Sequence, residues 1–369
     1  MVAPPSYTSG LRLFALYVVG CITGGLIPGQ AIFTQLFIDA GLFSDVCESG
    51  DVAPCYNQFM VCADIMTSMS TLVMFFMLPA GILFDSYGGQ IAGTLGCAIL
   101  FLGLLVLITL LVVRDEWMRP YEPVMFTVGV LLCDLGSYTN NVAFFAFLWH
   151  LPGYQALLLS LSNAVYQVSS FLPILLQQLM RATGLGFTAA LGVYALVVIG
   201  AAVVCYLVTP GLLEYRQTAA QVLGVPLPRK RATWRDVNKQ LSGAWAVLRK
   251  DWTRHAQFNV LAILGMVPPS IYTAMATPFG DELFRDDEEH NGKQLALLFN
   301  QVNGVLGIVV GPLAGTLADA LGGGKPLSSR ALPPLIALTA ALSVVLPFII
   351  AVPSYALPGY PRTPPVRAR

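Results

Sequence analysis

A row of polar side chains lies inside one long apolar stretch of the sequence. Asn163, Tyr166, Gln167 and Ser170 are spaced three, four and seven residues from the first of them, which places all four on one face of a helix. Their amide and hydroxyl groups could hydrogen-bond the carboxylate and ammonium groups of a small zwitterion without a fixed charge. They could equally join neighbouring helices by hydrogen bonds, and both interpretations stay open.

Asp134 is an acidic side chain near the middle of another apolar stretch, with Tyr138 one helical turn further on. A carboxylate at membrane depth is costly, so it tends to face the interior of a helix bundle or a watery cavity. Asp134 could couple to protons or pair with an ammonium group. Alternatively, it is a neutral side chain that hydrogen-bonds Tyr138 or another helix.

Three amide side chains extend this set of candidates for a polar pathway. Gln30 follows Pro28 and Gly29, where a broken helix would release backbone carbonyl groups toward a bound solute, although a simple packed kink is the alternative. Asn300 and Asn303 lie in a later apolar stretch, beside a row of glycines that we interpret as a packing surface.

No residue pattern points to catalysis, a metal or a cofactor. The three histidines are scattered, the seven cysteines form no CxxC motif, and the apolar stretches carry no paired-acid or nucleophile motif. We therefore expect that the protein is not an enzyme and needs no cofactor. Cys47 and Cys55 lie eight residues apart in a polar loop and could form a disulfide if that loop faces an oxidising compartment.

The composition excludes a soluble globular protein. Of the 369 residues, 56% are hydrophobic and 11% charged, whereas a soluble domain carries roughly 25% charged residues. The 20 Lys and Arg residues balance the 20 Asp and Glu residues, which leaves no basic excess to bind nucleic acid. We expect an all-α integral membrane protein whose partner is the lipid bilayer.

Nine apolar stretches are long enough to cross a bilayer, which takes about 20 residues of helix. They cover residues 11–37, 57–84, 90–113, 122–149, 153–180, 185–209, 256–278, 293–318 and 331–352. The polar segment 210–255 between the sixth and the seventh contains nine basic and three acidic residues. The positive-inside rule places this segment in the cytoplasm, and with it the N-terminus, because six spans separate the two.

A ten-residue segment is repeated after the second and the eighth apolar stretches. Residues 80–89 align with residues 314–323, and six of the ten positions are identical. In each copy a glycine is followed by an aspartate four residues later and by another glycine after three more. Such an aspartate could accept hydrogen bonds from the N-terminus of a neighbouring helix and act as a switch, or lie solvated in a plain tight turn.

These glycine–acid segments resemble the signature of the major facilitator superfamily, which lies in the loops between helices two and three and between eight and nine. The resemblance implies a gating role for the six repeated residues Gly81, Asp85, Gly88, Gly315, Asp319 and Gly322. Residues 41–47 and 78–88 are also similar to the facilitative large-neutral amino-acid transporter branch of that superfamily. The segment from Phe147 to Ser170 is a fainter match.

The resemblance implies a major-facilitator-like helical bundle that carries out sodium-independent uniport of neutral amino acids by alternating access. A small-molecule substrate would then be the partner, and the multi-pass protein would reside in the plasma membrane or in an internal membrane such as that of the vacuole. The alternatives are a transporter of another small solute and a non-transporting membrane protein with the same fold.

Two homologous halves would each hold six helices, whereas the sequence predicts about nine, six followed by three. We therefore expect that the last three helices of the second half are missing, which would also explain why Arg362, Arg367 and Arg369 follow a span that ends outside. The expected domains are an N-terminal half at 1–209, a basic cytoplasmic linker at 210–255, a partial second half at 256–352 and a tail at 353–369.

Overall fold

The computed structural model describes residues 7–47, 55–73, 77–113 and 117–224, with single residues and short stretches between 238 and 320. Most of the linker and of the predicted spans 256–278 and 293–318 lies outside the described residues, as do the whole of 331–352 and the tail. Of the candidate site residues, Asn300, Asn303 and Gly322 lie outside as well. The described elements are α-helices and short 3-10 helices, with no strand among them.

The first predicted span is broken. Helix α1 (Tyr7–Ile22) is followed by the 3-10 helix η1 (Ile27–Gly29) and then by α2 (Gln30–Asp39), and the two halves are bent by 53°. The sequence placed a break at Gly29, after Pro28, but the helix ends earlier, at Ile22. Pro28 lies instead in the first turn of the second half, where a missing N–H breaks no helical hydrogen bond.

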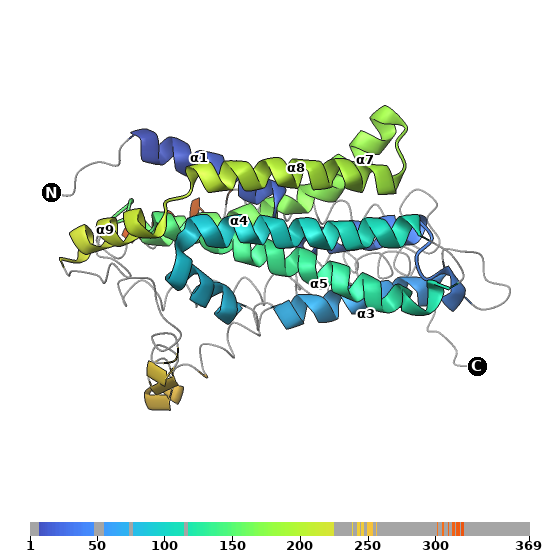
Figure 1. Cartoon of the computed structure of the whole chain (residues 1–369), viewed down its shortest axis with the longest axis horizontal. Helices are drawn as coiled ribbons and strands as arrows, with labels where there is room; N and C mark the ends of the chain where they lie inside the picture. The colour runs from blue at the N-terminus through green and yellow to red at the C-terminus, as the bar shows by residue number, and fades with distance from the viewer. Residues whose placement is uncertain are drawn as a thin grey trace, which may run out of the picture.

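The second and third predicted spans follow a disulfide loop. After η2 (Ser44–Val46), α3 (Tyr56–Val73) covers most of the second predicted span, and α4 (Met77–Val112) covers the end of the second and nearly all of the third. Gly88 kinks α4 with φ 84° and ψ 169°, values that glycine adopts without the steric cost of a Cβ. Figure 1 shows the segment before this kink leaving the axis of the long helix.

The fourth to sixth predicted spans correspond to the next helical elements of the structure. After the short η4 (Arg119–Tyr121), these are α5 (Glu122–Asn141), η5 (Val142–Phe147), α6 (Gln155–Val168), η6 (Ser169–Phe171), α7 (Leu172–Thr183) and α8 (Phe187–Val208). A further helix, α9 (Leu212–Leu223), occupies the start of the predicted linker. This helix was not predicted from the sequence.

Helices α4 and α5 pack with their backbones close together because small residues line their contact. A Cβ on Gly96 would lie 2.3 Å from the backbone nitrogen of Asn140, and one on Gly136 would lie 2.3 Å from that of Leu100. Small residues that allow close backbone approach are typical of helix contacts in membranes, where dispersion contacts replace the hydrophobic effect as the driving force. Helix α8 lies beside α4 (Figure 1).

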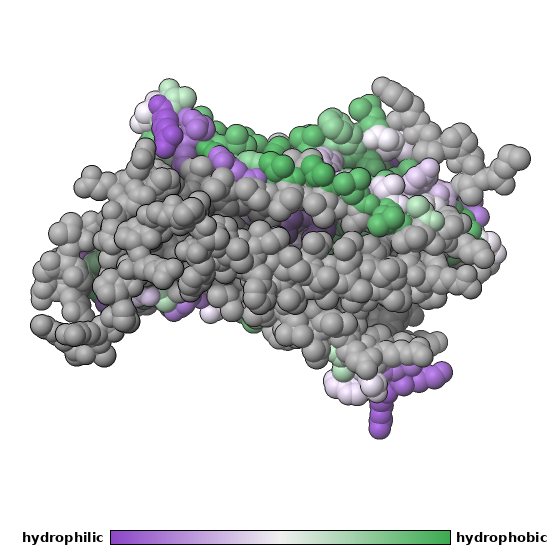
Figure 2. All heavy atoms as spheres, turned by 180° about the vertical axis from the view of Figure 1, so that it is seen from behind, coloured by the Kyte–Doolittle hydropathy of each residue, from purple (hydrophilic) through white to green (hydrophobic). Residues whose placement is uncertain are grey.

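The described helices include several that could cross a membrane. By length and composition these are Pro79–Val112, Gln155–Thr183 and Phe187–Val208, and the bent pair Thr8–Ile22 and Ile27–Asp39 would make a fourth. Large apolar side chains on α8, such as Leu196, are exposed. Figure 2 shows hydrophobic atoms along the edge of the molecule where α8 lies in Figure 1. The chain is therefore an α-helical membrane protein; how many spans it has stays a prediction.

Candidate functional site

The break in the first span is stabilised by a carboxylate from another helix. Asp134 on α5 accepts hydrogen bonds through Oδ1 from the backbone N–H groups of Leu26, at 3.0 Å, and Ile27, at 3.4 Å. These N–H groups begin the second half of the broken span, where no preceding turn can accept their hydrogen bonds. Asp134 is 1% exposed, so it caps a buried half-helix in the way that an N-cap side chain does from within its own helix.

The end of the first half-helix is held by side chains from α5 and α8. Tyr194 donates its hydroxyl hydrogen to the carbonyl oxygen of Ile22 at 2.9 Å. The Thr23 hydroxyl lies 2.9 Å from the Val19 carbonyl oxygen and 2.8 Å from Oδ1 of Asn140. Interrupted backbone is tolerated at membrane depth where neighbouring groups satisfy the released hydrogen bonds, and these contacts meet that requirement.

Two glycines leave room for the neighbouring helices at the break. A Cβ on Gly24 would lie 2.0 Å from Oγ of Ser169, and one on Gly25 would lie 2.9 Å from Oδ1 of Asp134. Gly25 also has φ 80°, in the region that glycine adopts most readily. The bend of the first span and the approach of Asp134 therefore depend on the absence of side chains here.

A small cavity lies beside the break, between α1, α5 and α6. Its volume is about 10 Å³, close to the space that one water molecule needs. The lining residues are Gly20, Thr23, Gly24, Ser137, Asn140, Asn141, Val165 and Tyr166.

Several buried polar atoms at or near this cavity have no hydrogen-bond partner within 3.5 Å among the described residues. They are Oδ2 of Asp134, Oγ of Ser137 and Oδ1 of Asn141. The rings of Tyr138 and Tyr166 lie 5.2 Å apart. Because most buried polar groups in proteins are hydrogen-bonded, these atoms leave room for a small polar partner of about the size of one water molecule.

The structure separates some of the predicted pathway residues from this cavity. Gln30 donates from Nε2 to Oγ1 of Thr67, at 2.8 Å, and to the Ala63 carbonyl oxygen, so it joins α2 to α3. Asn163 is exposed, whereas Tyr166 and Gln167 are partly buried. Ser170 is buried, but α6 ends at Val168. The predicted row of four therefore does not form one α-helical face, because the helix changes to a 3-10 turn before its last member.

Ser137 and Asn141 were missed by the sequence analysis although a signal for them was present. They follow Asp134 by three and seven residues, which is the spacing of one helical face. The importance of Asn140, by contrast, depends on tertiary contacts: its Nδ2 donates to the Gly93 carbonyl oxygen at 3.0 Å and to Sγ of Cys97 at 3.1 Å. No spacing rule places those partners together.

The second copy of the repeated segment contacts α6. Asp319 accepts hydrogen bonds from the backbone N–H groups of Ala156, at 3.1 Å, and Leu157, at 2.8 Å. Gly315 lies against the same turn, since a Cβ there would be 2.0 Å from Oγ of Ser160. The aspartate thus caps the N-terminus of a neighbouring helix, one of the two arrangements that the sequence left open.

The first copy of the repeat has different surroundings. A Cβ on Gly81 would meet nothing within 4 Å, so this glycine does not serve the close packing seen at Gly315. Asp85 is exposed, and its backbone carbonyl oxygen accepts a hydrogen bond from Nη2 of Arg216 at 3.2 Å. Gly88 faces α9, because a Cβ there would lie 2.7 Å from the backbone nitrogen of Leu212.

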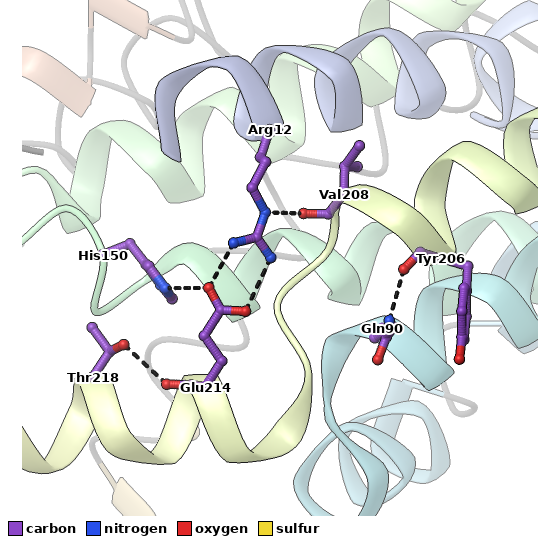
Figure 3. A network of polar contacts seen from close by, with 7 residues as sticks. All are labelled: Arg12, Gln90, His150, Tyr206, Val208, Glu214 and Thr218. Atoms are coloured by element: carbon purple, nitrogen blue, oxygen red, sulfur yellow. Dashed lines mark hydrogen bonds and ion pairs between the residues drawn. The ribbon is translucent and has the colours of Figure 1, made fainter. Parts of the chain in front are cut away.

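Helix α9 is joined to the start of the chain by an ion-pair network, shown in Figure 3. Nη1 and Nη2 of Arg12 donate to the two carboxylate oxygens of Glu214 at 2.6 and 3.0 Å, and Nε donates to the Val208 carbonyl oxygen at 2.7 Å. Nε2 of His150 lies 3.3 Å from Oε1 of Glu214. The hydrogen bonds from Arg12 lower the pKa of Glu214, although partial burial opposes this shift.

The loop between α2 and α3 is stabilised by a disulfide and by a hydrogen bond to the first residue of α5. Cys47 and Cys55 form a disulfide, as the sequence allowed. Glu122 at the start of α5 accepts a hydrogen bond from the backbone N–H of Phe43 at 2.6 Å. Phe43 has φ 58°, an unusual conformation for a residue with a large side chain; a charged acceptor stabilises its N–H there.

Comparisons with known proteins do not assign a family. No family model matches the chain, and no curated protein matches it.

Proposed function

We propose that this protein is a secondary transporter of the major-facilitator type, which moves neutral amino acids across a membrane by facilitative uniport. The break in the first span carries this proposal. It places two half-helix ends, a buried carboxylate and side-chain oxygens that have no hydrogen-bond partner among the described residues at one location. Discontinuous helices of this kind form the binding sites of many secondary transporters, because half-helix ends provide polar groups at the middle of the membrane.

The chemistry of the break suits a zwitterion. The end of α1 and Oδ2 of Asp134 favour a positive group. The N-terminal half-helix end at Ile27 favours a negative group, a place that Oδ1 of Asp134 takes in this structure. The hydroxyl groups of Ser137 and Tyr166 can donate or accept hydrogen bonds. The cavity in this structure holds about one water molecule, so a whole amino acid would bind only after the surrounding helices separate.

The contact between Asp319 and α6 provides the step that alternating access requires. It connects the second repeated segment to the part of the chain that holds the cavity. In this proposal the contact closes one side of the pathway, and breaking it opens that side. The network of Arg12, His150 and Glu214 fixes α9 near the kink of α4 (Figure 1), and we place this end of the molecule on the cytoplasmic side.

The experiment is counterflow of radiolabelled leucine into liposomes that contain the purified 369-residue chain. We expect label to accumulate transiently in vesicles preloaded with unlabelled leucine, and neutral amino acids to compete better than cationic or anionic ones. Competition by a different solute class alone would contradict the substrate assignment. Leucine binding without any flux would contradict the transport proposal and favour a non-transporting protein with this fold.

A further inference from the structure

We propose that the cavity beside the break of the first span is a binding site for a small monovalent cation, with Asp134 as its counter-charge. Two sources share this chemistry: a dissolved ion such as Na⁺, and the ammonium group at the end of an organic molecule. The proposal concerns binding and does not require that the ion is transported, so it is compatible with facilitative uniport. It also does not depend on the chain being a transporter.

The position of the cavity favours positive charge. Gly20, Thr23 and Gly24, from the last turn of α1 and the residues just after it, form one wall. The carboxyl end of a helix carries a partial negative charge, because its last carbonyl groups lack intrahelical partners. In transporters with broken helices, such carbonyl ends are the groups that coordinate small cations.

The unused atoms around the cavity are oxygens, as a hard cation requires. Ser137 is 2% exposed, lines the cavity, and has a hydroxyl group without a partner among the described residues. Oδ1 of Asn141, which also lines the cavity, has no hydrogen-bond partner among the described residues either. The volume of about 10 Å³ admits a group of about the size of one water molecule, which describes a dehydrated small cation or a single ammonium group.

Asp134 supplies a charge that its other contacts leave incompletely compensated. Its Oδ1 accepts the hydrogen bonds from Leu26 and Ile27, whereas its Oδ2 has no partner in the described residues. Ser137 follows it by one turn, and both Oδ1 of Asp134 and Oγ of Ser137 lie within 3.1 Å of the place that a Cβ on Gly25 would take. A buried carboxylate without a charged partner is unfavourable, and a cation at the cavity removes that penalty.

The test is the melting temperature of the purified full chain in detergent. Choline chloride is replaced at constant ionic strength by sodium chloride in one series and by methylammonium chloride in a second. Choline is too large for the cavity, so it serves as the reference. For the wild-type protein we expect the melting temperature to rise by about 5 °C when the bound cation is in hundredfold excess over its dissociation constant.

Two variants separate the site from general ion effects. Asp134→Asn removes the charge but keeps an amide oxygen that can accept the hydrogen bonds of Leu26 and Ile27, so the broken span stays capped; we expect its melting temperature to be insensitive to both cations. The matched control is Asp64→Asn, which makes the same chemical change at an exposed position on α3. It should retain the full wild-type response.

Each outcome decides the proposal. A response of the wild-type protein to sodium alone assigns a dissolved ion, and a response to methylammonium alone assigns an organic ammonium group. If neither cation raises the melting temperature, or if Asp134→Asn responds as the wild type does, the proposed cation site is wrong and the cavity holds water only. Because leucine counterflow is measured separately, a failed transport experiment would not affect this result, and a failed cation response would not exclude transport.

Discussion

Asp134 connects two parts of the chain that are more than one hundred positions apart, since its carboxylate caps backbone groups of the first span from helix α5. The two carboxylate oxygens of Asp134 have different surroundings. Oδ1 satisfies the backbone at the break, and Oδ2 is directed to no partner among the described residues. The same residue can therefore stabilise the break and provide charge to a ligand.

The capping role predicts that Asp134→Ala is more destabilising than Asp134→Asn. Alanine leaves the N–H groups of Leu26 and Ile27 buried without an acceptor, whereas asparagine still offers an oxygen. We expect the free energy of unfolding to fall by about 2 kcal/mol more in the alanine variant. Chemical denaturation in mixed micelles, with Asp64→Ala as control, measures this difference. Equal stability of the alanine and asparagine variants would show that the cap is unimportant.

Sequence reasoning reached Asp134 but not its partners. Its position in an apolar stretch marked it as unusual. Asp134 accepts hydrogen bonds from Leu26 and Ile27 because α5 packs beside the break of the first span. No local sequence pattern predicts that packing. Asn163 was predicted to line the pathway because its spacing fitted a polar helix face, but it is exposed. Periodicity identifies the residues on one face of a helix and does not tell which element packs against that face.

At the scale of elements, helices α4 and α5 are held together by a close contact between backbones. We expect Gly96→Ala to lower the free energy of unfolding by about 2 kcal/mol, because the added Cβ would lie 2.3 Å from a backbone nitrogen of α5 and the helices would have to separate. Gly192→Ala on α8 is the matched control, since a Cβ there meets nothing within 4 Å. That change should be neutral or slightly stabilising. Thermal unfolding followed by circular dichroism compares the two.

The ion pair between Arg12 and Glu214 on α9 should make the stability of the folded protein depend on pH. The pKa of Glu214 is lowered in the folded protein by the hydrogen bonds from Arg12, so the ionised form stabilises the fold. This contribution is complete above the ordinary glutamate pKa of about 4.5 and is lost as the pH falls through the lower, folded value.

The melting temperatures of the wild type and Glu214→Gln should therefore differ at pH 7 and converge as the pH falls below about 4.5. Asp45→Asn, an exposed change in the disulfide loop, serves as the control and should not show this convergence. A constant difference between the wild type and Glu214→Gln across the range would mean that the Arg12 contact does not stabilise the folded protein.

The elements themselves follow from the sequence more closely than their ends do. The apolar stretches at 90–113 and 185–209 correspond to the distal part of α4 and to α8, since length and apolarity suffice to define a lipid-facing helix. Helix α9 was missed because it is short and mixed in polarity. The predicted break at Gly29 lies too late in the chain, since the helix ends at Ile22. Pro28 is a strong local signal for a break, whereas the contacts of Asp134 and Tyr194 that stabilise the earlier one are tertiary and cannot be read from local sequence.

At the scale of the molecule, Asp319 and Gly315 bring the second repeated segment against α6, whereas the first repeated segment makes no such contact among the described residues. In the proposed transport cycle, the cap by Asp319 and the close approach at Ser160 form the contact that would have to break. The repeat itself was visible in the sequence. Its partner helix was not, because the residues that meet are separated by more than 150 positions.

The most direct measurement is leucine counterflow by Gly315→Ala, compared with the wild type and with the matched change Gly81→Ala in the first repeated segment. A Cβ on Gly315 would lie 2.6 Å from Cα of Leu157, so the second repeated segment could not dock on α6, whereas a Cβ on Gly81 meets nothing within 4 Å. The account predicts that Gly315→Ala reduces counterflow severalfold at equal amounts of reconstituted protein and that Gly81→Ala retains it. Wild-type counterflow by Gly315→Ala would contradict the account.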